Sequence, residues 1–379
     1  MNPLLRLVID FIQRVLRTVD LPLLFALCGL MAASLAVLAS VGGESSRLVM
    51  SQGARFVVGI GAMWLISRVR PPTLRDVSPW LYALSLIPLA AVLVIGTGKH
   101  GNHWIDLGVF YFQPAELFKL CLPMMLAWYL DRSRLPPRIG TTLIAGLIIA
   151  IPVGLIMRQP DFGTAMLIGA SGVFALYLAG LAWGWFAAGA GLAGVGYGLA
   201  KFAPIAWFEP FLRPYQVSRI LTFRDPANDP LGDGWNIIQS KIAIGSGGWF
   251  GKGWGNSSQS SLNYLPEYTT DFAFSVLSEE FGWAGVLAVL ALYLFVIGRC
   301  LWIAVEARDG YSRIVAGTLG FALFVYVLVN AGMISGLLPV VGVPMPLISF
   351  GGTSAVAILA GMGLVMSAGA HERKRGSAG

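Results

Sequence analysis

Charged side chains are scarce in this sequence. Lys, Arg, Asp and Glu together make up 12% of the 379 residues, whereas a soluble domain carries roughly 25%. Cysteine is also scarce, because the chain has only Cys28, Cys121 and Cys300, which lie in apolar segments without paired spacing. The low charge excludes an ordinary soluble domain. The cysteine positions support neither a disulfide framework nor a metal site.

Apolar residues dominate the composition instead. The hydrophobic fraction is 56% and the mean hydropathy is +0.73. A helix needs about 20 predominantly apolar residues to cross roughly 30 Å of hydrocarbon. Runs of this kind predict an all-α membrane protein with about ten transmembrane helices. The runs lie near residues 21–41, 52–68, 78–96, 114–130, 141–157, 162–180, 182–200, 272–304, 314–335 and 352–370.

The basic residues predict how the chain is oriented, because basic connections stay on the cytoplasmic side of a membrane. If the N-terminus is cytoplasmic, the inner segments hold 15 of the 26 basic residues but only seven of the 19 acidic ones. We therefore expect both termini in the cytoplasm. This topology and contact with membrane lipid explain the pI of about 9.4, so the basic balance does not indicate nucleic-acid binding.

The expected organisation is a single membrane domain at residues 21–370. Residues 1–20 alternate charged and apolar residues at helical spacing, which predicts an amphipathic helix at the cytoplasmic interface. Residues 371–379 form a short basic tail. The segment at about 201–270 is the one long connection, and we expect it outside the cell, with short interfacial helices within 207–223 and 236–241.

The helix after this outer loop carries an unusual set of polar residues. Asp271 lies at its start, and Ser275, Ser278 and Glu279 follow at i+4, i+7 and i+8. This spacing places them on one face, which must contact a cavity or another helix because carboxylates facing lipid are costly. The simple alternative for Asp271 is a helix N-cap, since it follows two threonines and precedes a helix.

Four other charged residues also lie near the expected outer ends of helices. Glu116 and Lys119 are spaced i, i+3 after Pro114, which favours an ion pair but also allows Lys119 to meet a phosphate. Asp161 follows a tight turn and is typical of an N-cap. Arg55 is expected at the start of its helix, with its side chain extended to the interface.

Two irregular segments are rich in glycine or proline. The run at 242–252 does not fit a nucleotide-binding loop, because Lys252 is followed by Gly253 and no strand precedes it. We interpret it as a water-facing loop whose backbone approaches a ligand or the end of a helix. The segment at 344–354 predicts an irregular hairpin that lines an outer cavity.

Together these residues resemble the shape, elongation, division and sporulation (SEDS) family. The resemblance covers nearly the whole chain, and its context favours the branch that acts in cell elongation over the branch that acts in division. The matching motifs are Pro114–Glu116 with Lys119, Gln159–Thr164, Tyr215–Gln216 with Arg219, Asp225–Pro226, Asp229–Pro230, Gln239–Gly248, Leu265–Glu267, Thr270–Phe272, Glu279–Glu280 and Ser349–Gly352.

The resemblance implies a peptidoglycan glycosyltransferase that polymerises lipid II on the outer face of the inner membrane. It also implies that the protein works with a class B penicillin-binding protein, a transpeptidase, and other membrane proteins of the elongation machinery. The family's catalytic aspartate corresponds to Asp271, its membrane-embedded acid and base to Glu116 and Lys119, and its outer arginine to Arg219.

The chemistry of this reaction suggests a role for each site residue. Asp271 is expected to take the proton of the attacking sugar hydroxyl. The leaving pyrophosphate needs cations or polar donors, and the candidates for substrate binding are Arg219, Lys119, Gln216, Lys241 and Arg55. Glu116, Asp161, Glu279 and Ser349 are expected to support the cavity. A divalent cation such as Mg²⁺ or Mn²⁺ is compatible with this chemistry, although no ligand cluster in the sequence assigns one.

Two other functions remain open at this stage. A lipid II flippase also needs a polar cavity in the membrane. A noncatalytic scaffold of the elongation machinery would need only a surface for its partner. The clustering of charged and glycine-rich features at the outer end favours the synthase, whereas the inner connection at 178–184 carries no charge.

Overall fold

The computed structural model describes residues 18–40, 45–97, 103–106, 108, 111–210, 212, 214–230, 232–262 and 264–376. The predicted interfacial helix at residues 1–20 lies almost entirely outside these residues.

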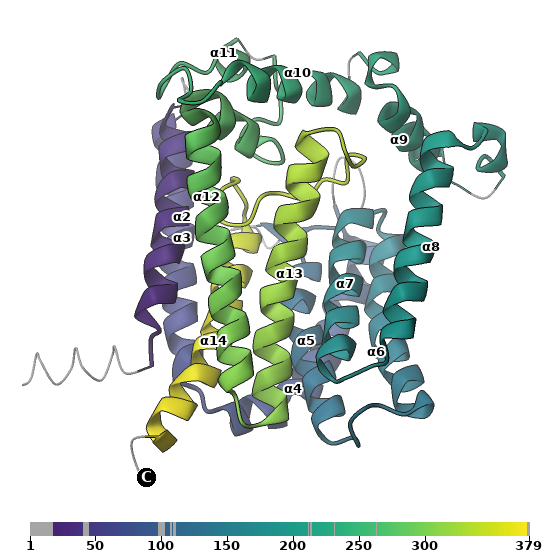
Figure 1. The fold of residues 1–379 in the computed structure, drawn as a ribbon, viewed down its shortest axis with the longest axis vertical. Coiled ribbons are helices and arrows are strands. Elements are labelled where there is room, and N and C mark those ends of the chain that lie inside the picture. Colours follow the sequence, from purple (N-terminus) through teal and green to yellow (C-terminus); the bar gives the residue numbers. More distant parts are fainter. Residues whose placement is uncertain are drawn as a thin grey trace, which may run out of the picture.

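Long helices dominate the described part of the chain, and each apolar run of the sequence corresponds to one of them (Figure 1). Seven are long and apolar enough to cross a membrane, and α7 is a shorter apolar helix. The all-α membrane fold is therefore confirmed. The long helices are α2 (Leu21–Ser40), α3 (Ser45–Arg68), α4 (Pro71–Ile95), α5 (Ala115–Asp131), α6 (Ile139–Arg158), α7 (Phe162–Leu178), α8 (Trp183–Phe202), α12 (Ala273–Glu306), α13 (Gly310–Ile334) and α14 (Thr353–Gly376).

Several helices extend beyond the apolar runs that predicted them. α3 begins at Ser45, α4 begins at Pro71, and α14 continues through Gly376. An apolar window marks only the part of a helix suited to hydrocarbon, whereas polar turns prolong the helix outside it. Proline is well tolerated at the start of α4. The N–H group that proline lacks would have no intrahelical acceptor in the first turn of a helix. Arg55 consequently lies within α3 and not at its start, which corrects its expected position.

The connection between α8 and α12, called the cap here, lies across one end of the bundle, opposite the C-terminus (Figure 1). The predicted helical stretch at 207–223 is wrong in part, because Pro210 and Pro214 interrupt it and the regular helix begins only at Pro214. The predicted turn at 236–241 is longer than expected and makes Ile242–Ser246 helical. The cap contains η1 (Ile205–Trp207), α9 (Pro214–Arg224), η2 (Pro226–Asn228), α10 (Asp233–Ser246) and α11 (Ser258–Ser261).

A small antiparallel hairpin, absent from the predictions, lies between α4 and α5. It pairs β1 (Ile105–Asp106) with β2 (Tyr111–Phe112), and Ile105 lies opposite Phe112.

The core of the bundle is built around α13, which packs against α12, α7 and α5. α14 and α3 form a second tightly packed pair. A side chain at Gly363 of α14 would overlap the backbone of Met63, so glycine permits this close approach.

The helix α8 packs differently from the rest of the bundle. It has no buried residue, and a Cβ at Gly189, Gly191 or Gly194 would meet no neighbouring atom within 4 Å. Its cap end is attached through Arg224, whose Nε donates to the carbonyl of Ala200 over 2.7 Å. α8 therefore borders the bundle without closing against it (Figure 1).

Candidate functional site

Asp271 lies in the turn that leads from the cap into α12, with its carboxyl partly buried. The helix begins after Phe272, which has no side-chain capping bond, so the N-cap interpretation of Asp271 is wrong. Asn330 of α13 holds the backbone here, because its Nδ2 donates to the carbonyl oxygens of both Asp271 and Val343 over 2.8 Å. These two bonds hold Asp271 beside the segment that follows α13. A Cβ on Gly342 of that segment would lie 3.6 Å from Asp271 Oδ2.

Several charged groups around Asp271 change its acidity. Burial and, to a smaller extent, the negative charges of Glu267, Asp233 and Asp161 raise the pKa of the Asp271 carboxyl, whereas Arg219 lowers it. The net result is a pKa of about 7, compared with an ordinary value of 3.8. The site thus brings together residues from the cap, including α10, and from the start of α7. Its carboxyl gains and loses a proton near neutral pH.

Arg219 and Gln216 come from α9, one turn apart, and both are partly buried. The structure places Arg219 close enough to Asp271 to act on its charge. Lys241 of α10 is exposed and lies against Gly336, where a Cβ would be 2.8 Å from its Nζ. These side chains come from two different helices of the cap.

Glu116 and Lys119 form an ion pair in the first turns of α5, with Lys119 Nζ 2.6 Å from Glu116 Oε1. Both side chains are largely buried. Lys119 also donates to Ser354 Oγ of α14 over 3.3 Å and lies 4.9 Å from the centre of the Tyr326 ring. The pair therefore joins α5, α13 and α14.

Asp161 caps α7. Its Oδ1 accepts from the Thr164 amide, and its Oδ2 accepts from Gln113 Nε2, each over 3.0 Å. The cap function expected from its position is therefore present. The second bond ties the start of α7 to the residue before Pro114, and hence to the first turn of α5.

Arg55 and Ser349 support the segment between α13 and α14. The Arg55 guanidinium lies 4.2 Å from the centre of the Phe350 ring. The Ser349 hydroxyl is buried and accepts from the Met345 amide over 2.8 Å. The Phe350 amide donates to the carbonyl of Thr269 over 2.7 Å. This bond joins the segment directly to the turn that carries Asp271.

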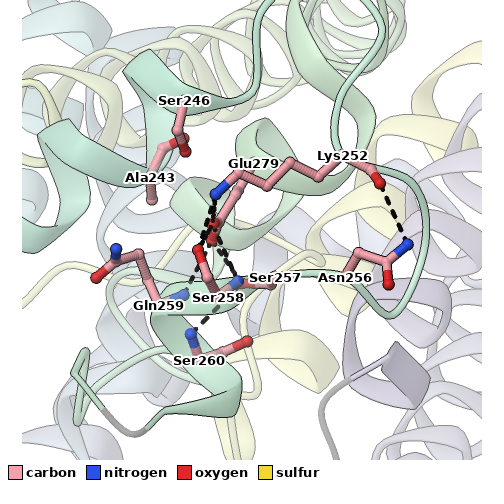
Figure 2. A network of polar contacts seen from close by, with 9 residues as sticks. All are labelled: Ala243, Ser246, Lys252, Asn256, Ser257, Ser258, Gln259, Ser260 and Glu279. Atoms are coloured by element: carbon pink, nitrogen blue, oxygen red, sulfur yellow. Dashed lines mark hydrogen bonds and ion pairs between the residues drawn. The ribbon is translucent and has the colours of Figure 1, made fainter.

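The polar face of α12 contacts the cap, as one of the two sequence interpretations required. Ser275 Oγ lies 2.6 Å from Ser240 Oγ of α10. Glu279 is fully buried and accepts from the hydroxyls of Ser257 and Ser258, each over 2.6 Å (Figure 2). It also forms an ion pair with Lys252, so one carboxylate holds both the middle and the far end of the loop between α10 and α11.

The backbone of the loop after α10 supplies hydrogen bonds at a break in α12. Gly282 has φ 63° and ψ −162°, which interrupts the helical hydrogen bonds. The amides of Trp283 and Ala284 donate instead to the carbonyls of Gly248 and Trp249, over 2.9 and 3.0 Å. On the other side of the break, the carbonyls of Glu279 and Glu280 accept from the amides of Lys252 and Gly253, both over 3.0 Å. The expectation that the glycine-rich backbone approaches a ligand or a helix end is thus resolved in favour of a helix.

Sequence reasoning missed three residues near Asp271. Asn330 is a polar residue inside an apolar run, which could have marked it. Glu267 stood in a recognised motif without a role, and Asp233 carried no signal because only the fold brings α10 to Asp271. Among the described residues, no group of three or more His, Cys, Asp or Glu side chains could hold a metal ion. The divalent cation therefore stays a prediction.

Comparison with known proteins identifies the family to which this chain belongs. The family model for the cell cycle proteins FtsW, RodA and SpoVE matches residues 13–374. Peptidoglycan glycosyltransferase MrdB of Escherichia coli K12 is 43% identical over 356 residues, covering 93% of this chain and 94% of the relative. A probable peptidoglycan glycosyltransferase FtsW of Halorhodospira halophila is 36% identical over 366 residues, covering 94% and 90%.

Solved structures agree with this placement. The crystal structure of the rod shape determining protein RodA of Thermus thermophilus matches with a TM-score of 0.69 at 27% identity, covering 94% of this chain and 97% of that one. A chain from a study of polymerization and crosslinking by a peptidoglycan synthase complex matches with a TM-score of 0.78 at 31% identity, covering 94% and 98%. The chain therefore belongs to the FtsW, RodA and SpoVE family of cell cycle proteins, which is the SEDS family that its motifs resemble.

Proposed function

We propose that this protein is a peptidoglycan glycosyltransferase that polymerises lipid II into glycan strands on the outer face of the bacterial inner membrane during cell elongation. The names of its relatives support the activity. The observation that carries the mechanism is Asp271, a carboxyl with a pKa of about 7 beside Arg219. A base is most useful when its pKa lies near the working pH.

In this mechanism the Asp271 carboxylate removes the proton from the 4-hydroxyl of the acceptor sugar. The hydroxyl oxygen then attacks the anomeric carbon of the donor, and the bond from that carbon to the lipid pyrophosphate breaks. The electron pair leaves with the pyrophosphate, and the configuration at carbon inverts. A positioned base contributes about 10²–10⁴-fold to such a step.

Cations stabilise the leaving pyrophosphate. Arg219 is our main candidate, because it lies near Asp271 and its planar guanidinium can bind two phosphate oxygens. Lys241 of α10 and Gln216 of α9 are further candidates in the cap. Lys119 is already paired with Glu116, so its role in this proposal is to hold the helices beneath the site in place. Arg55 likewise acts through Phe350.

The open side of α8 suits the lipid tail. A polyprenyl chain must stay in the membrane while its sugars reach the cap, and α8 has no buried residue along its length. Its glycines leave its surface smooth. We infer that the tail lies along α8, directly below the cap residues that contact the pyrophosphate.

A partner is also expected. One structural neighbour comes from a peptidoglycan synthase complex in which polymerization and crosslinking are coordinated. We propose that this chain likewise acts with a class B penicillin-binding protein, which crosslinks the strands, and with other membrane proteins of the elongation machinery.

Polymerisation by purified protein tests the proposal. Wild-type protein and Asp271→Asn protein are incubated with labelled lipid II, alone and with the transpeptidase, and glycan products are separated by length. We expect Asp271→Asn to lose about 10²–10⁴-fold in rate. Glu209→Gln, which removes an exposed acid elsewhere in the cap, should keep the wild-type rate.

Two results would count against the proposal. Polymer formation by Asp271→Asn at the wild-type rate would contradict the role of this carboxylate. Transport of labelled lipid II across vesicles by wild-type protein, without any polymer, would indicate a flippase.

A further inference from the structure

An apolar hollow lies at the end of the bundle opposite the cap, where the connection from α5 to α6 meets the connection from α7 to α8. Its volume is about 240 Å³, and its walls include Pro137, Ile139, Leu143, Leu181, Ala182 and Trp185. A cavity needs roughly 10–15 Å³ of such space to hold one water molecule, so this hollow is many times larger. The hollow can therefore hold part of a hydrocarbon chain.

The chain on either side of Pro136 and Pro137, which line the hollow, is basic. Arg134 and Arg138 lie in the α5–α6 connection and are exposed, and neither has an acidic partner among the described residues. The segments 132–143 and 179–186 contain no Asp or Glu. α6 and α8 also begin here, without side-chain caps, so their electropositive ends add to the charge of the arginines.

Other nearby residues place the hollow at the depth of a membrane interface. Trp183 and Trp185 are exposed at the start of α8, and tryptophan is enriched where headgroups meet hydrocarbon. Ile139 and Leu143 are also exposed, on the surface of α6 that leads away into the membrane. A hydrocarbon chain could therefore enter from the adjacent leaflet without crossing water.

We propose that this hollow binds an anionic phospholipid of the adjacent leaflet. One acyl chain lies in the hollow, and the phosphate meets Arg134 and Arg138. Free phosphate or a peptide would fit less well, because the apolar walls offer few hydrogen-bond donors. The hydroxyl of Thr142, which also lines the hollow, donates to the carbonyl of Arg138 over 3.1 Å and is already occupied.

Native mass spectrometry of the full-length protein in detergent tests this assignment. The protein is titrated with phosphatidylglycerol, phosphatidylethanolamine or inorganic phosphate, and the retained ligand is counted for each variant. Phosphatidylglycerol should bind, with phosphatidylethanolamine much weaker and phosphate unable to compete. An arginine near a membrane surface contributes about 1 kcal/mol toward anionic lipid, so the double variant R134Q/R138Q should bind phosphatidylglycerol roughly thirtyfold more weakly.

Two further variants separate charge from shape. Ala182→Phe should fill the hollow and reduce retention of phosphatidylglycerol while leaving both arginines intact. Arg70→Gln removes an exposed arginine at the same end of the bundle, before α4, and should bind like wild type. Each variant is used only if its thermal unfolding profile matches that of wild type.

The proposal fails if R134Q/R138Q retains phosphatidylglycerol as wild type does. It also fails if phosphatidylethanolamine binds equally well, if phosphate displaces the lipid, or if Ala182→Phe leaves retention unchanged.

Discussion

At the scale of single residues, the neighbours of Asp271 give its carboxyl an acidity suited to proton transfer. Burial alone would favour the protonated form, and Glu267 and Asp233 add negative charge, whereas Arg219 favours the ionised form. The result is a pKa of about 7, near which a group can accept a proton and later release it. A fully solvated aspartate would be a much weaker base.

The pH dependence of polymerisation should therefore report on Asp271. In the proposed mechanism the carboxylate is the active form, so we expect the rate to rise with pH and to reach half its maximum near pH 7. Glu267→Gln removes a negative charge that disfavours ionisation, so it should lower the pKa of Asp271. We expect the half-maximal point to move to lower pH by up to about one unit.

The measurement is the rate with labelled lipid II between pH 5 and pH 9, with wild type and Glu267→Gln compared directly. Glu209→Gln serves as the control, since it removes an exposed acid that does not act on Asp271 in the structure. A profile that stays fixed in Glu267→Gln would show that another group controls the acid limb.

The stability of the fold should depend on the same proton. The pKa of Asp271 is higher in the folded protein than its ordinary value of 3.8, so the folded state binds the proton more tightly. This contribution is fully present below about pH 4 and is lost as the pH rises toward 7. Above that pH the folded protein holds a partly buried, poorly compensated charge.

Asp271→Asn should therefore raise the apparent melting temperature at pH 8, by roughly 1–2 °C if about 1 kcal/mol is gained. At pH 5 the difference should be much smaller, since asparagine resembles the protonated acid. Thermal unfolding of both proteins in the same detergent at the two pH values provides the measurement. A stabilisation of equal size at both values would exclude ionisation as its cause.

Sequence reasoning identified Asp271 because a carboxylate beside an apolar helix is unusual. It could not identify Asp233, which lies on a different helix and reaches the site only through the fold. The N-cap interpretation of Asp271 failed for a local reason. The helix starts one residue later than its polar spacing suggested, at Ala273 after Phe272.

At the scale of elements, the interrupted helix α12 shows what an apolar pattern conceals. The run at 272–304 predicted one continuous helix, and its bounds were close to those observed. The break at Gly282 has no clear signal, because glycine is common in transmembrane helices. Only the loop after α10 makes the break acceptable, since its backbone replaces the missing helical hydrogen bonds.

This arrangement predicts different effects for two glycines of the loop. Gly251 and Gly255 both have positive φ, 78° and 77°, so alanine at either position costs about 1–2 kcal/mol in backbone strain. A Cβ at Gly251 would also overlap the carbonyl oxygen of Glu280, whereas a Cβ at Gly255 would meet open space. Gly251→Ala should therefore lose about 1–3 kcal/mol more than Gly255→Ala.

Thermal unfolding and limited proteolysis of the loop measure this difference. We expect Gly251→Ala to melt at a lower temperature and to be cleaved faster between residues 247 and 262, with Gly255→Ala close to wild type in cleavage. Equal effects of the two substitutions would mean that the loop does not need its close contact with α12.

At the scale of the whole molecule, the apolar runs located the helices but not how tightly they pack. The apolar runs predicted both α8 and α13 as transmembrane helices. However, α13 is the centre of the core, whereas α8 has no buried residue. Both sequences are apolar, because a helix in a membrane is apolar whether it faces lipid or protein. Packing therefore had to come from the structure, and with it the open side on which we place the lipid tail.

The mechanism also requires the cap to face outward, because polymerisation takes place outside the membrane. Single cysteines test this orientation in a background in which Cys28, Cys121 and Cys300 are replaced. Glu209→Cys lies in the cap, and Arg70→Cys lies at the opposite end, where the carbonyl of neighbouring Val69 accepts from Ser367 of α14 over 2.6 Å. Both positions are exposed, so both should react once the membrane is opened.

In intact spheroplasts, a membrane-impermeant maleimide should label Glu209→Cys and leave Arg70→Cys unmodified, since basic connections remain in the cytoplasm. The reverse pattern would put Asp271 on the wrong side for glycan synthesis.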